Sequence, residues 1–397
     1  MKFAHIADVH LGNWRDPKLK DLVAKSFIKS IDKCIEERVD FVIVSGDLFH
    51  TALPSIDYIK LVIKKLKELR DANIRFYYIA GSHDFSPSGK TMLDLIEEAE
   101  LGINVMKGTI DDAGKLNLDF IKDKTGAKLT GVIAKRGMLD KKYYEILDKR
   151  SLREEEGFKI FLFHTTLEEL KPKELDMMDS TNISFLPRGF DYYAGGHVHI
   201  VKKADLEGYK NVVYPGPLFP ANFAELQKLG YGGFYIYEDG DIRRVELKLK
   251  DVISFEFEVS SSEDANKKLE KILSQDVKDK IILIRIKGVL ETGKTTDIRF
   301  KEITQSLYDK GAYHVLKNSS GLKLKDFVET KVNHSTIKEL EEDIIQSNVS
   351  GKIPDETELI QNLLHSLSQE RHEGEKVYEY EERIKKEAYL LMDDNEA

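Results

Sequence analysis

The feature that most constrains the fold of this chain is a short apolar segment that runs directly into a polar tip. The segment Phe3–Ala7 has the length and composition of a buried strand, and Asp8 and His10 follow at its end. Strand ends are where α/β proteins place their ligands. A single Asp-x-His at a strand end is more often turn chemistry than a metal site, so the pattern becomes informative only where it recurs.

The pattern recurs twice more, each time after a segment with helical periodicity. Helices are predicted over Leu19–Glu37 and Tyr58–Arg70, and the apolar runs Phe41–Val44 and Ile74–Ile79 follow them as strands. Alternating strands and helices predict a parallel sheet, in which all these strand tips reach the same edge. The polar residues at the two new tips are Asp47, His50, Ser82 and His83.

Two later strands add further imidazoles. Lys159–Phe163 ends in His164, and Phe190–Ala194 leads through two glycines to His197 and His199. The glycines permit a tight backbone turn, and the His-x-His alternation offers two imidazoles to neighbouring metals or to opposite faces. No comparable cluster occurs later in the sequence.

These tips carry more ligands than one ion needs, which suits two ions bridged by a carboxylate. Imidazole and carboxylate donors without thiolate fit Mn²⁺ best, with Mg²⁺, Fe²⁺ or Zn²⁺ as alternatives. Two ions about 3.5–4 Å apart can activate a water and clamp both oxygens of an in-line phosphoryl displacement. The sequence therefore predicts a two-metal site for a phosphoester. Its candidate residues are Asp8, His10, Asp47, His50, His83, His164, His197 and His199.

Composition limits the alternatives. The net charge is −9, and the segment from Lys331 onward accounts for all of it, with 8 Lys and Arg against 17 Asp and Glu. A nucleic-acid partner would therefore need local basic patches, because the rest of the chain has no positive field. The single Cys34 excludes an internal disulfide, and no apolar run approaches the roughly 18 residues of a membrane helix. Without a signal-peptide pattern, a cytoplasmic location is expected.

The histidines outside the tips and the scattered cations carry weaker predictions. His5 lies inside the first strand and is expected to be a satisfied core residue, and Trp14 either stacks on a base or packs. For each candidate phosphate contact, a solvated surface position is the favoured alternative. These candidates are Lys90, Lys135, Arg136, Arg188, Lys202 and Lys203, and the histidines read as ordinary polar positions are His314, His334, His365 and His372.

Three regions are expected along the chain. Residues 1–250 contain the strand tips and end in two antiparallel strands, and residues 251–320 alternate strand and helix as a small separate layer. Residues 331–397 are acidic and helical, with apolar stripes that either pack on the chain itself or present a face to another protein.

The order of the tip motifs resembles that of the metallophosphoesterase superfamily. More narrowly, Asp8-Val9-His10-Leu11-Gly12 and Gly46-Asp47-Leu48-Phe49-His50 are similar to the double-strand-break repair nucleases of the bacterial SbcD and the archaeal and eukaryotic meiotic-recombination-eleven group. The resemblance covers residues 8–199 by motif. It implies an α/β fold of two sheets sandwiched between helices, a small α/β capping domain that contacts DNA, and a C-terminal helical segment.

The resemblance also implies a role for each site residue. Asp8, His10, Asp47 and His199 would hold the first Mn²⁺, with Asp47 bridging. His164, His197 and the residue before His83 would hold the second. His83 would then protonate the leaving oxygen, and His50 would orient the phosphate. The implied reactions are 3′ to 5′ exonuclease on duplex DNA and endonuclease on single strands or hairpins.

One residue departs from the family pattern inside the site. The family has Asn before this His, whereas here the residue is Ser82. A hydroxyl is shorter than an amide and a weaker ligand, so either Ser82 Oγ or a water takes the position, and weaker binding of the second metal is expected.

The resemblance further implies two partners besides DNA ends. The C-terminal helices would bind the coiled coil of an ABC-type ATPase, and helices of the nuclease domain would form a homodimer. Two other functions remain open: a phosphodiesterase or protein phosphatase of the same superfamily acting on small or peptide substrates, and a DNA-end-binding scaffold with weak chemistry of its own.

Overall fold

The structure, a computed structural model, describes residues 1–86, 91–135, 141–324, 345, 355–372 and 375–393. Contacts divide the chain into two compact units, Met1–Lys325 and Asp326–Ala397. Among the described residues, no helix combines the length and apolar character needed to cross a membrane. Lys90, Arg136 and His334 fall outside the described residues.

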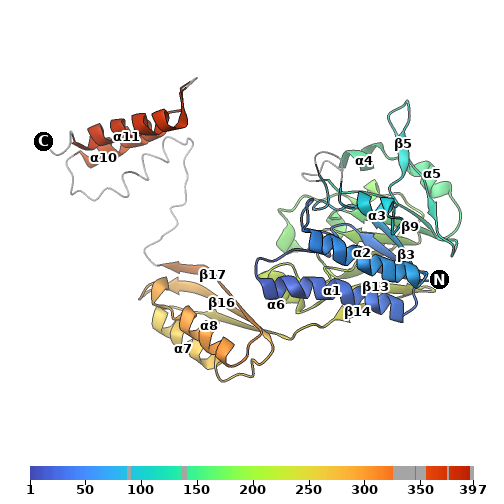
Figure 1. Ribbon diagram of the computed structural model, residues 1–397, viewed down its shortest axis with the longest axis horizontal. Coiled ribbons are helices and arrows are strands. Elements are labelled where there is room, and N and C mark those ends of the chain that lie inside the picture. The colour runs from blue at the N-terminus through green and yellow to red at the C-terminus, as the bar shows by residue number, and fades with distance from the viewer. Residues whose placement is uncertain (87–90, 136–140, 325–344, 346–354, 373–374, 394–397) are drawn as a thin grey trace. The chain divides into compact units, whose positions relative to one another are not determined.

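The first sheet contains the first three tip-bearing strands. Its order is β14-β13-β1-β2-β3-β4. Strands β1 to β3 run parallel as expected, β4 continues this parallel arrangement, and β13 and β14 are antiparallel. The helices between them cover one face of this sheet (Figure 1). The bounds are β1 Lys2–Ile6, α1 Pro17–Glu36, β2 Phe41–Ser45, α2 Ile56–Asp71, β3 Arg75–Ile79, α3 Asp94–Glu98, β4 Ile103–Asn104, β13 Gly232–Glu238 and β14 Asp241–Leu247.

The second sheet contains the later two tips. Its order is β11-β12-β10-β9-β8-β7, and β8, β9, β10 and β12 are parallel, so His164 and His197 leave the same edge. The bounds are β7 Ile121–Lys122, β8 Lys128–Val132, β9 Lys159–His164, β10 Tyr192–Gly196, β11 Lys202–Leu206 and β12 Tyr209–Tyr214. Around this sheet lie β5 Gly108–Ile110, β6 Leu116–Leu118, α4 Lys141–Ile146, α5 Lys149–Glu154, η2 Glu168–Leu170, η3 Lys173–Leu175 and η4 Ile183–Phe185. The helix α6, Phe223–Leu229, instead contributes Leu226 to the core of the first sheet.

The helical pattern over residues 141–149 predicts one helix there, but α4 ends early, at Ile146, and a separate helix, α5, begins at Lys149 and continues to Glu154. Asp148 explains the break, because its side chain accepts a hydrogen bond from Arg150 N at 3.1 Å and so caps α5.

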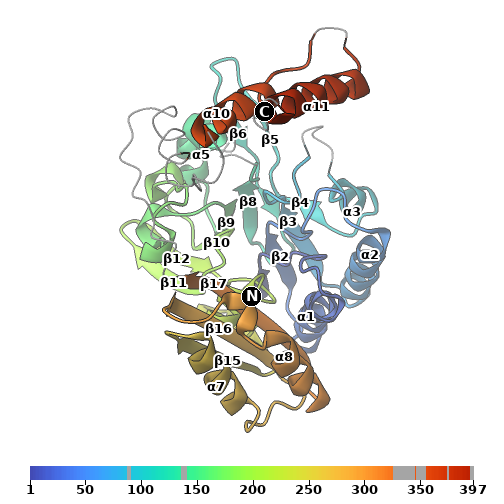
Figure 2. The same cartoon turned by 90° about the vertical axis from the view of Figure 1, so that its left-hand side faces the viewer.

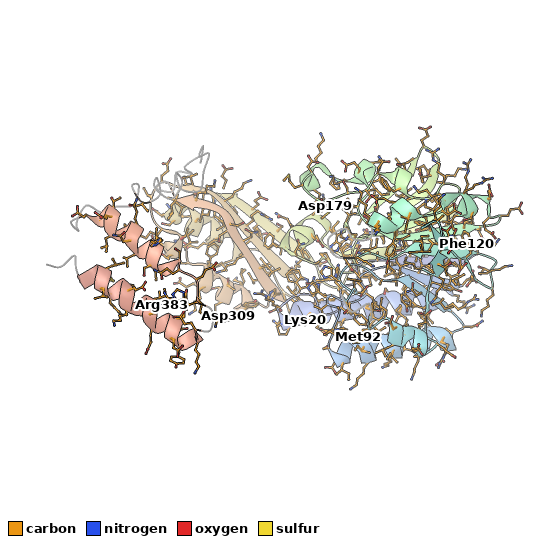
Figure 3. All side chains as sticks on the ribbon, turned by 90° about the horizontal axis from the view of Figure 1, so that it is seen from above. Lys20, Met92, Phe120, Asp179, Asp309 and Arg383 are labelled. Atoms are coloured by element: carbon orange, nitrogen blue, oxygen red, sulfur yellow. The ribbon has the colours of Figure 1, made fainter. Side chains whose placement is uncertain are left out.

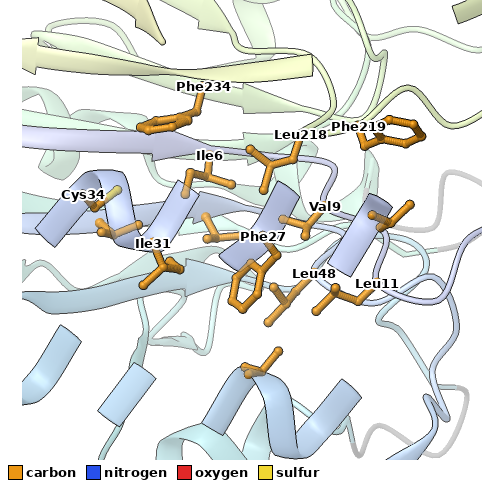
Figure 4. Close-up of a cluster of buried hydrophobic side chains, with 14 of the residues drawn as sticks. Ile6, Val9, Leu11, Phe27, Ile31, Cys34, Leu48, Leu218, Phe219 and Phe234 are labelled. Carbon is orange, nitrogen blue, oxygen red and sulfur yellow. The ribbon is translucent and has the colours of Figure 1, made fainter. Parts of the chain in front are cut away.

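Strands of the first sheet are apolar on both faces because both faces are buried. Phe41 and Ile43 of β2 pack between the two sheets, whereas Val42 and Val44 pack toward the helices. Phe27 and Ile31 of α1 contribute to the helix-side core together with Cys34 (Figure 4). The two sheets thus form a sandwich with helices outside (Figure 2). This is the expected fold class, and it fixes where the strand tips lie.

A third, three-stranded sheet follows the sandwich. Its strands run parallel in the order β15-β16-β17, and α7 and α8 pack on it around a core that includes Leu269, Ile284 and Leu307. The apolar run over residues 313–316 predicts a short final strand, but β17 extends to Leu324 because its polar residues continue to pair with β16. The bounds are β15 Val252–Glu258, α7 Ser262–Ile272, β16 Ile281–Leu290, η5 Thr295–Asp297, α8 Phe300–Asp309 and β17 His314–Leu324.

The second unit contains a pair of helices, α10 (Glu356–Leu367) and α11 (Val377–Asp393). Arg383 of α11, labelled in Figure 3, contacts the link between the two helices: its Nη1 donates to Gln369 Oε1 at 2.7 Å, and its Nε pairs with Glu375 at 2.9 Å. Ser366 Oγ donates to Glu387 Oε2 at 3.2 Å. This bond joins α10 directly to α11.

Candidate metal centre

The tips of the two sheets meet at one buried cluster. Asp47 Oδ2 lies 3.1 Å from His164 Nε2, and Asp8 Oδ1 lies 4.0 Å from His164 Nδ1. All three side chains are almost inaccessible to solvent. One atom from each of them falls within 4.8 Å of the others, a spacing that can hold a cation. The sandwich thus brings carboxylates of the first sheet against an imidazole of the second.

A second group of donors adjoins the first. His10 Nε2 lies 2.9 Å from His199 Nε2 and 3.6 Å from Asp47 Oδ2, and His199 Nε2 lies 3.9 Å from Asp8 Oδ1. Two imidazole lone pairs at this separation repel each other unless a proton or a cation lies between them. The donor set of oxygens and nitrogens fits a hard or borderline divalent cation.

Hydrogen bonds at the outer nitrogens fix the orientation of three imidazoles. His164 Nδ1 lies 2.7 Å from Ser45 O, and His83 Nδ1 lies 2.8 Å from His50 O. A carbonyl oxygen only accepts, so Nδ1 carries the proton in both rings and the Nε2 lone pair stays available. His199 Nδ1 is held in the same way by Glu225 Oε1 at 3.0 Å. Such outer partners are typical of metal-ligating histidines.

The backbone at the tips adopts conformations that side chains rarely accept. Positive φ angles occur at Asp8 (51°), His10 (49°), Asp47 (52°), His197 (97°) and His199 (53°). Each such residue costs on the order of 1–3 kcal/mol, and residues of this kind cluster at functional sites. The surrounding structure therefore stabilises these strained backbone conformations, which direct the side chains into the cluster.

Two glycines leave room for the cluster. A Cβ on Gly46, whose φ is +86°, would lie 2.2 Å from His164 Nδ1. A Cβ on Gly81 would lie 2.2 Å from both Asp47 N and Asp47 Oδ1. Any larger residue at either position would displace a proposed metal ligand.

The charges in the cluster are strongly coupled. Burial favours the neutral acid at Asp47, but the charges of His164 and His10 outweigh it and hold the pKa of Asp47 well below its usual range. Burial raises the pKa of Asp8. At His164, burial is opposed by Asp47, which raises the pKa to about 10, and at His199 burial is opposed by Asp8 and Glu225, which raise the pKa to about 9.

His197 behaves differently. Burial, together with the charge of His164, lowers the pKa of His197 to about 4, so this imidazole is neutral at pH 7. Its ring packs against His164 with centroids 5.1 Å apart, and its backbone N–H donates to Asp8 Oδ1 at 2.9 Å. A cation in the cluster would replace the protons on His164 and His199, so metal affinity is expected to rise with pH.

His50 and His83 lie together beside His10. Their rings stack with centroids 5.0 Å apart, and the His83 ring lies 4.8 Å from the ring of His10. One nitrogen from each of His10, His50 and His83 falls within the spacing of a metal site. Ser82 lies between two backbone amides that bind site carboxylates: Gly81 N donates to Asp84 Oδ2 at 3.0 Å, and His83 N donates to Asp47 Oδ1 at 2.8 Å.

Two residues of the site received no role from the sequence. Asp84 is buried and accepts from Leu48 N at 3.2 Å and Phe49 N at 2.9 Å as well as from Gly81, so it ties two strand tips together. Burial and the nearby Asp47 raise the pKa of Asp84 to about 7. The position of Asp84 directly after His83, at a strand tip, is a sequence signal that could have identified it as a site residue. Glu225 lies on α6, and nothing in its neighbourhood marked it.

The remaining predicted positions have simple surroundings. His5 is buried between Tyr192 Oη and Ser45 Oγ, each 3.0 Å from a ring nitrogen, as expected for a core histidine. The Trp14 indole donates to Pro220 O at 3.0 Å and packs on the helix-side core, which favours the packing alternative. Lys135 Nζ donates to Tyr143 Oη at 2.6 Å, whereas Arg188, Lys202 and Lys203 are exposed.

Comparison with known proteins places the cluster in a family context. The family model of the calcineurin-like phosphoesterases matches residues 1–201. Over 307 residues, the chain is 28% identical to the DNA double-strand break repair protein Mre11 of Archaeoglobus fulgidus, covering 72% of this chain and 68% of that protein. The protein of the same name from Sulfolobus acidocaldarius is 28% identical over 94% of this chain and 97% of its own length. That from Sulfurisphaera tokodaii is 31% identical over 61% of each.

Proposed function

The chain belongs to the calcineurin-like phosphoesterase family, and from this premise we propose that it is the DNA nuclease of a double-strand-break repair complex. It is a metal-dependent phosphodiester hydrolase by family. The observation that carries the proposal is the buried cluster in which Asp8 and Asp47 of one sheet face His164 of the other.

The proposed cation ligands form two sets that share Asp47. Asp8, His10 and His199 join Asp47 in the first set, and the distances of 2.9–3.9 Å among their ligand atoms support this assignment. Ser82, His164 and His197 join it in the second set. The chemistry that two divalent cations supply when bound is activation of a water and neutralisation of phosphoryl charge. Mn²⁺ fits the donors best.

His83 and His50 are proposed to act on the substrate. His83 Nδ1 is fixed by the carbonyl of His50, so Nε2 faces the cluster, where a protonated ring would donate to the leaving oxygen. The stacked His50 ring would orient the scissile phosphate beside it. The proposed reactions are 3′ to 5′ exonuclease on duplex DNA and endonuclease on single strands, acting on chromosomal DNA in the cytoplasm.

The three regions of the chain would divide the work. Residues 1–250 would form the nuclease domain and residues 251–320 a domain that contacts DNA. Residues 331–397 would bind an ABC-type coiled-coil ATPase. Leu364, Leu367 and Leu390 of the helix pair are about half exposed or more, which supports a face for a partner.

A homodimer is also proposed, through the helices α2 and α3. Leu53 is 77% exposed and Ile56 66% exposed at the start of α2, and Leu95 of α3 is also exposed. Large exposed apolar side chains such as these are candidates for burial in an interface. Leu53→Lys with Ile56→Lys is expected to convert a dimer to a monomer in sedimentation analysis.

The test is digestion of end-labelled duplex DNA with Mn²⁺ by the full chain, by His83→Ala and by His365→Ala as a control at an exposed histidine of the second unit. We expect the control to cleave normally and His83→Ala to lose cleavage while still binding Mn²⁺. Full cleavage by His83→Ala would remove its assigned role.

The same experiment separates the alternatives. Ser82 in place of Asn favours one of them, a DNA-end-binding scaffold with weak chemistry of its own. A chain that binds duplex ends but cleaves no DNA would support that function. A chain that hydrolyses a small phosphodiester but neither binds nor cleaves DNA would instead be a phosphodiesterase.

A further inference from the structure

The short helix α6 carries a carboxylate that holds one of the proposed metal ligands. Glu225 Oε1 lies 3.0 Å from His199 Nδ1 and accepts from Asn222 Nδ2 at 2.7 Å. Its other oxygen, Oε2, accepts from Ala221 N at 2.7 Å. Hydrogen bonds from Asn222 and Ala221 therefore fix both oxygens of the Glu225 carboxylate, independently of its contact with the His199 imidazole.

The segment before α6 is anchored to the first strand tip. Asn13 Nδ2 donates to Ala221 O at 3.0 Å, and the Trp14 indole donates to Pro220 O at 3.0 Å. Asn13 N in turn donates to His10 O at 2.9 Å. The backbone that bears His10 thus also positions the start of the helix that holds His199.

The same helix contacts the three-stranded sheet. Arg285 Nε of β16 donates to Gln227 Oε1 at 3.0 Å, and Gln227 Nε2 donates to Glu256 Oε2 of β15 at 3.2 Å. The Arg285 guanidinium also lies over the ring of Phe223, 4.9 Å from its centroid. Gln227 and Phe223 are each two residues from Glu225, so a shift of the small sheet would act on the helix close to that carboxylate.

We propose that Glu225 is a positioning residue for the first cation and that α6 couples the small sheet to the affinity of that cation. This inference rests on the metal set of the proposed function. The carboxylate keeps the Nδ1 proton on His199 and fixes the ring, so that Nε2 faces Asp8 and His10. The contacts of Gln227 hold the helix, and hence Glu225, in the position that this bond needs.

The size of the effect follows from the chemistry of outer partners. Loss of a carboxylate that supports a metal-bound histidine typically weakens metal binding about 10- to 100-fold. Loss of a contact further along such a network changes affinity by a smaller factor, roughly two- to tenfold. By linkage, a bound cation would strengthen the contact between α6 and the small sheet by the same factor.

The first test is calorimetric titration of Mn²⁺ into the full chain and into Glu225→Gln. Glutamine keeps the length of the side chain, but it has no negative charge and only one acceptor oxygen for the three donors His199, Asn222 and Ala221. The fold should survive this change, which circular dichroism would verify. We expect one of two ions to bind about tenfold more weakly or worse, with the other within about twofold. Unchanged affinity for both ions, or equal weakening of both, would overturn the role of Glu225.

The second test is a double-mutant cycle between Gln227→Ala and Glu225→Gln. Gln227→Ala alone should weaken the same ion roughly two- to tenfold, and it should have little further effect once Glu225 is replaced. Lys228→Ala, an exposed neighbour on the same helix, is the matched control and should not change either ion. Additive effects, or no effect of Gln227→Ala, would overturn the coupling.

These titrations contain no DNA, so they fail separately from the proposed function. Two bound Mn²⁺ with unaltered affinity in the variants would overturn this inference alone. A wild-type chain that binds no Mn²⁺ would overturn the proposed metal centre itself.

Discussion

Two buried histidines, His5 and His164, show how the middle of the sandwich differs from the edge where the strand tips meet. His5 in β1 and His164 at the end of β9 are both fully buried, and both contact Ser45. His5 meets two hydroxyl groups, Ser45 Oγ and Tyr192 Oη. His164 meets the Ser45 carbonyl on one side and the Asp47 carboxylate on the other.

Their partners send their pKa values in opposite directions. Burial lowers the pKa of His5 to about 3, because no charge compensates it. At His164 the carboxylates of Asp47 and Asp8 overcome burial and raise the pKa to about 10. Burial alone therefore says little about what a histidine does. The middle of the sandwich uses its histidine as a neutral polar link, whereas the edge concentrates charge that a cation can replace.

The largest effect is expected from a substitution in the metal cluster at the edge of the sandwich. Asp47→Asn removes the carboxylate shared by both proposed cation sets, and it should lower DNA cleavage more than the roughly 100-fold typical of losing an outer partner. Mn²⁺ binding should fall with it, which titration calorimetry would measure. Cleavage above a tenth of the wild-type rate would show that Asp47 is not the bridging ligand.

The next largest effect is expected from a substitution in the middle of the sandwich. His5→Leu leaves the buried hydroxyls of Ser45 and Tyr192 without their partner, and the free energy of unfolding should drop by about 2 kcal/mol. Denaturant unfolding would measure this loss. Cleavage per folded molecule should stay within about twofold of wild type, because His5 touches no proposed ligand side chain. A variant of full stability that no longer cleaves would erase the distinction between the two regions.

The pH dependence of stability sharpens the same contrast. The folded-state pKa of His5, about 3, is depressed from the ordinary 6.5, so between these values the unfolded chain binds a proton that the folded chain does not. The contribution of His5 to the free energy of unfolding is fully present above pH 6.5. It decreases as the pH drops toward 3, by up to about 1.4 kcal/mol per pH unit. The wild type should show this slope relative to His5→Leu in unfolding experiments at pH 4 to 7. Parallel curves would mean that His5 is protonated in the fold.

The strand tips could be predicted because parallel topology alone brings them together. The tip of each parallel strand reaches one edge whatever the side chains do, so Asp8, Asp47 and His83 were predictable neighbours. That two separate sheets align their edges, which sets His164 against Asp47, follows only from packing. The early end of α4 was missed, although Asp148 is a preferred N-cap residue and could have marked the start of a separate helix.

Glu225 illustrates what the sequence could not supply. It lies 26 residues after His199 in an unremarkable polar helix, and only folding places its carboxylate on the imidazole. Trp14 is similar. The sequence is compatible with both stacking on a base and packing, and only the fold shows that the indole N–H donates to Pro220 O. Contacts between distant loops carry no periodicity, so neither pairing had a pattern to detect.

The smallest expected effect lies at the edge, at the residue that departs from the family pattern. Ser82→Asn would replace a hydroxyl with a longer amide oxygen between the amides of Gly81 and His83, both of which already bind site carboxylates. The Mn²⁺ concentration for half-maximal cleavage should therefore fall, by roughly three- to tenfold, because an amide oxygen suits a hard cation better. Ser184→Asn, an exposed serine away from the tips, is the matched control and should leave the titration unchanged. If Ser82→Asn gives the wild-type titration, the second cation takes no ligand from this position, and the edge binds it through Asp47, His164 and His197 alone.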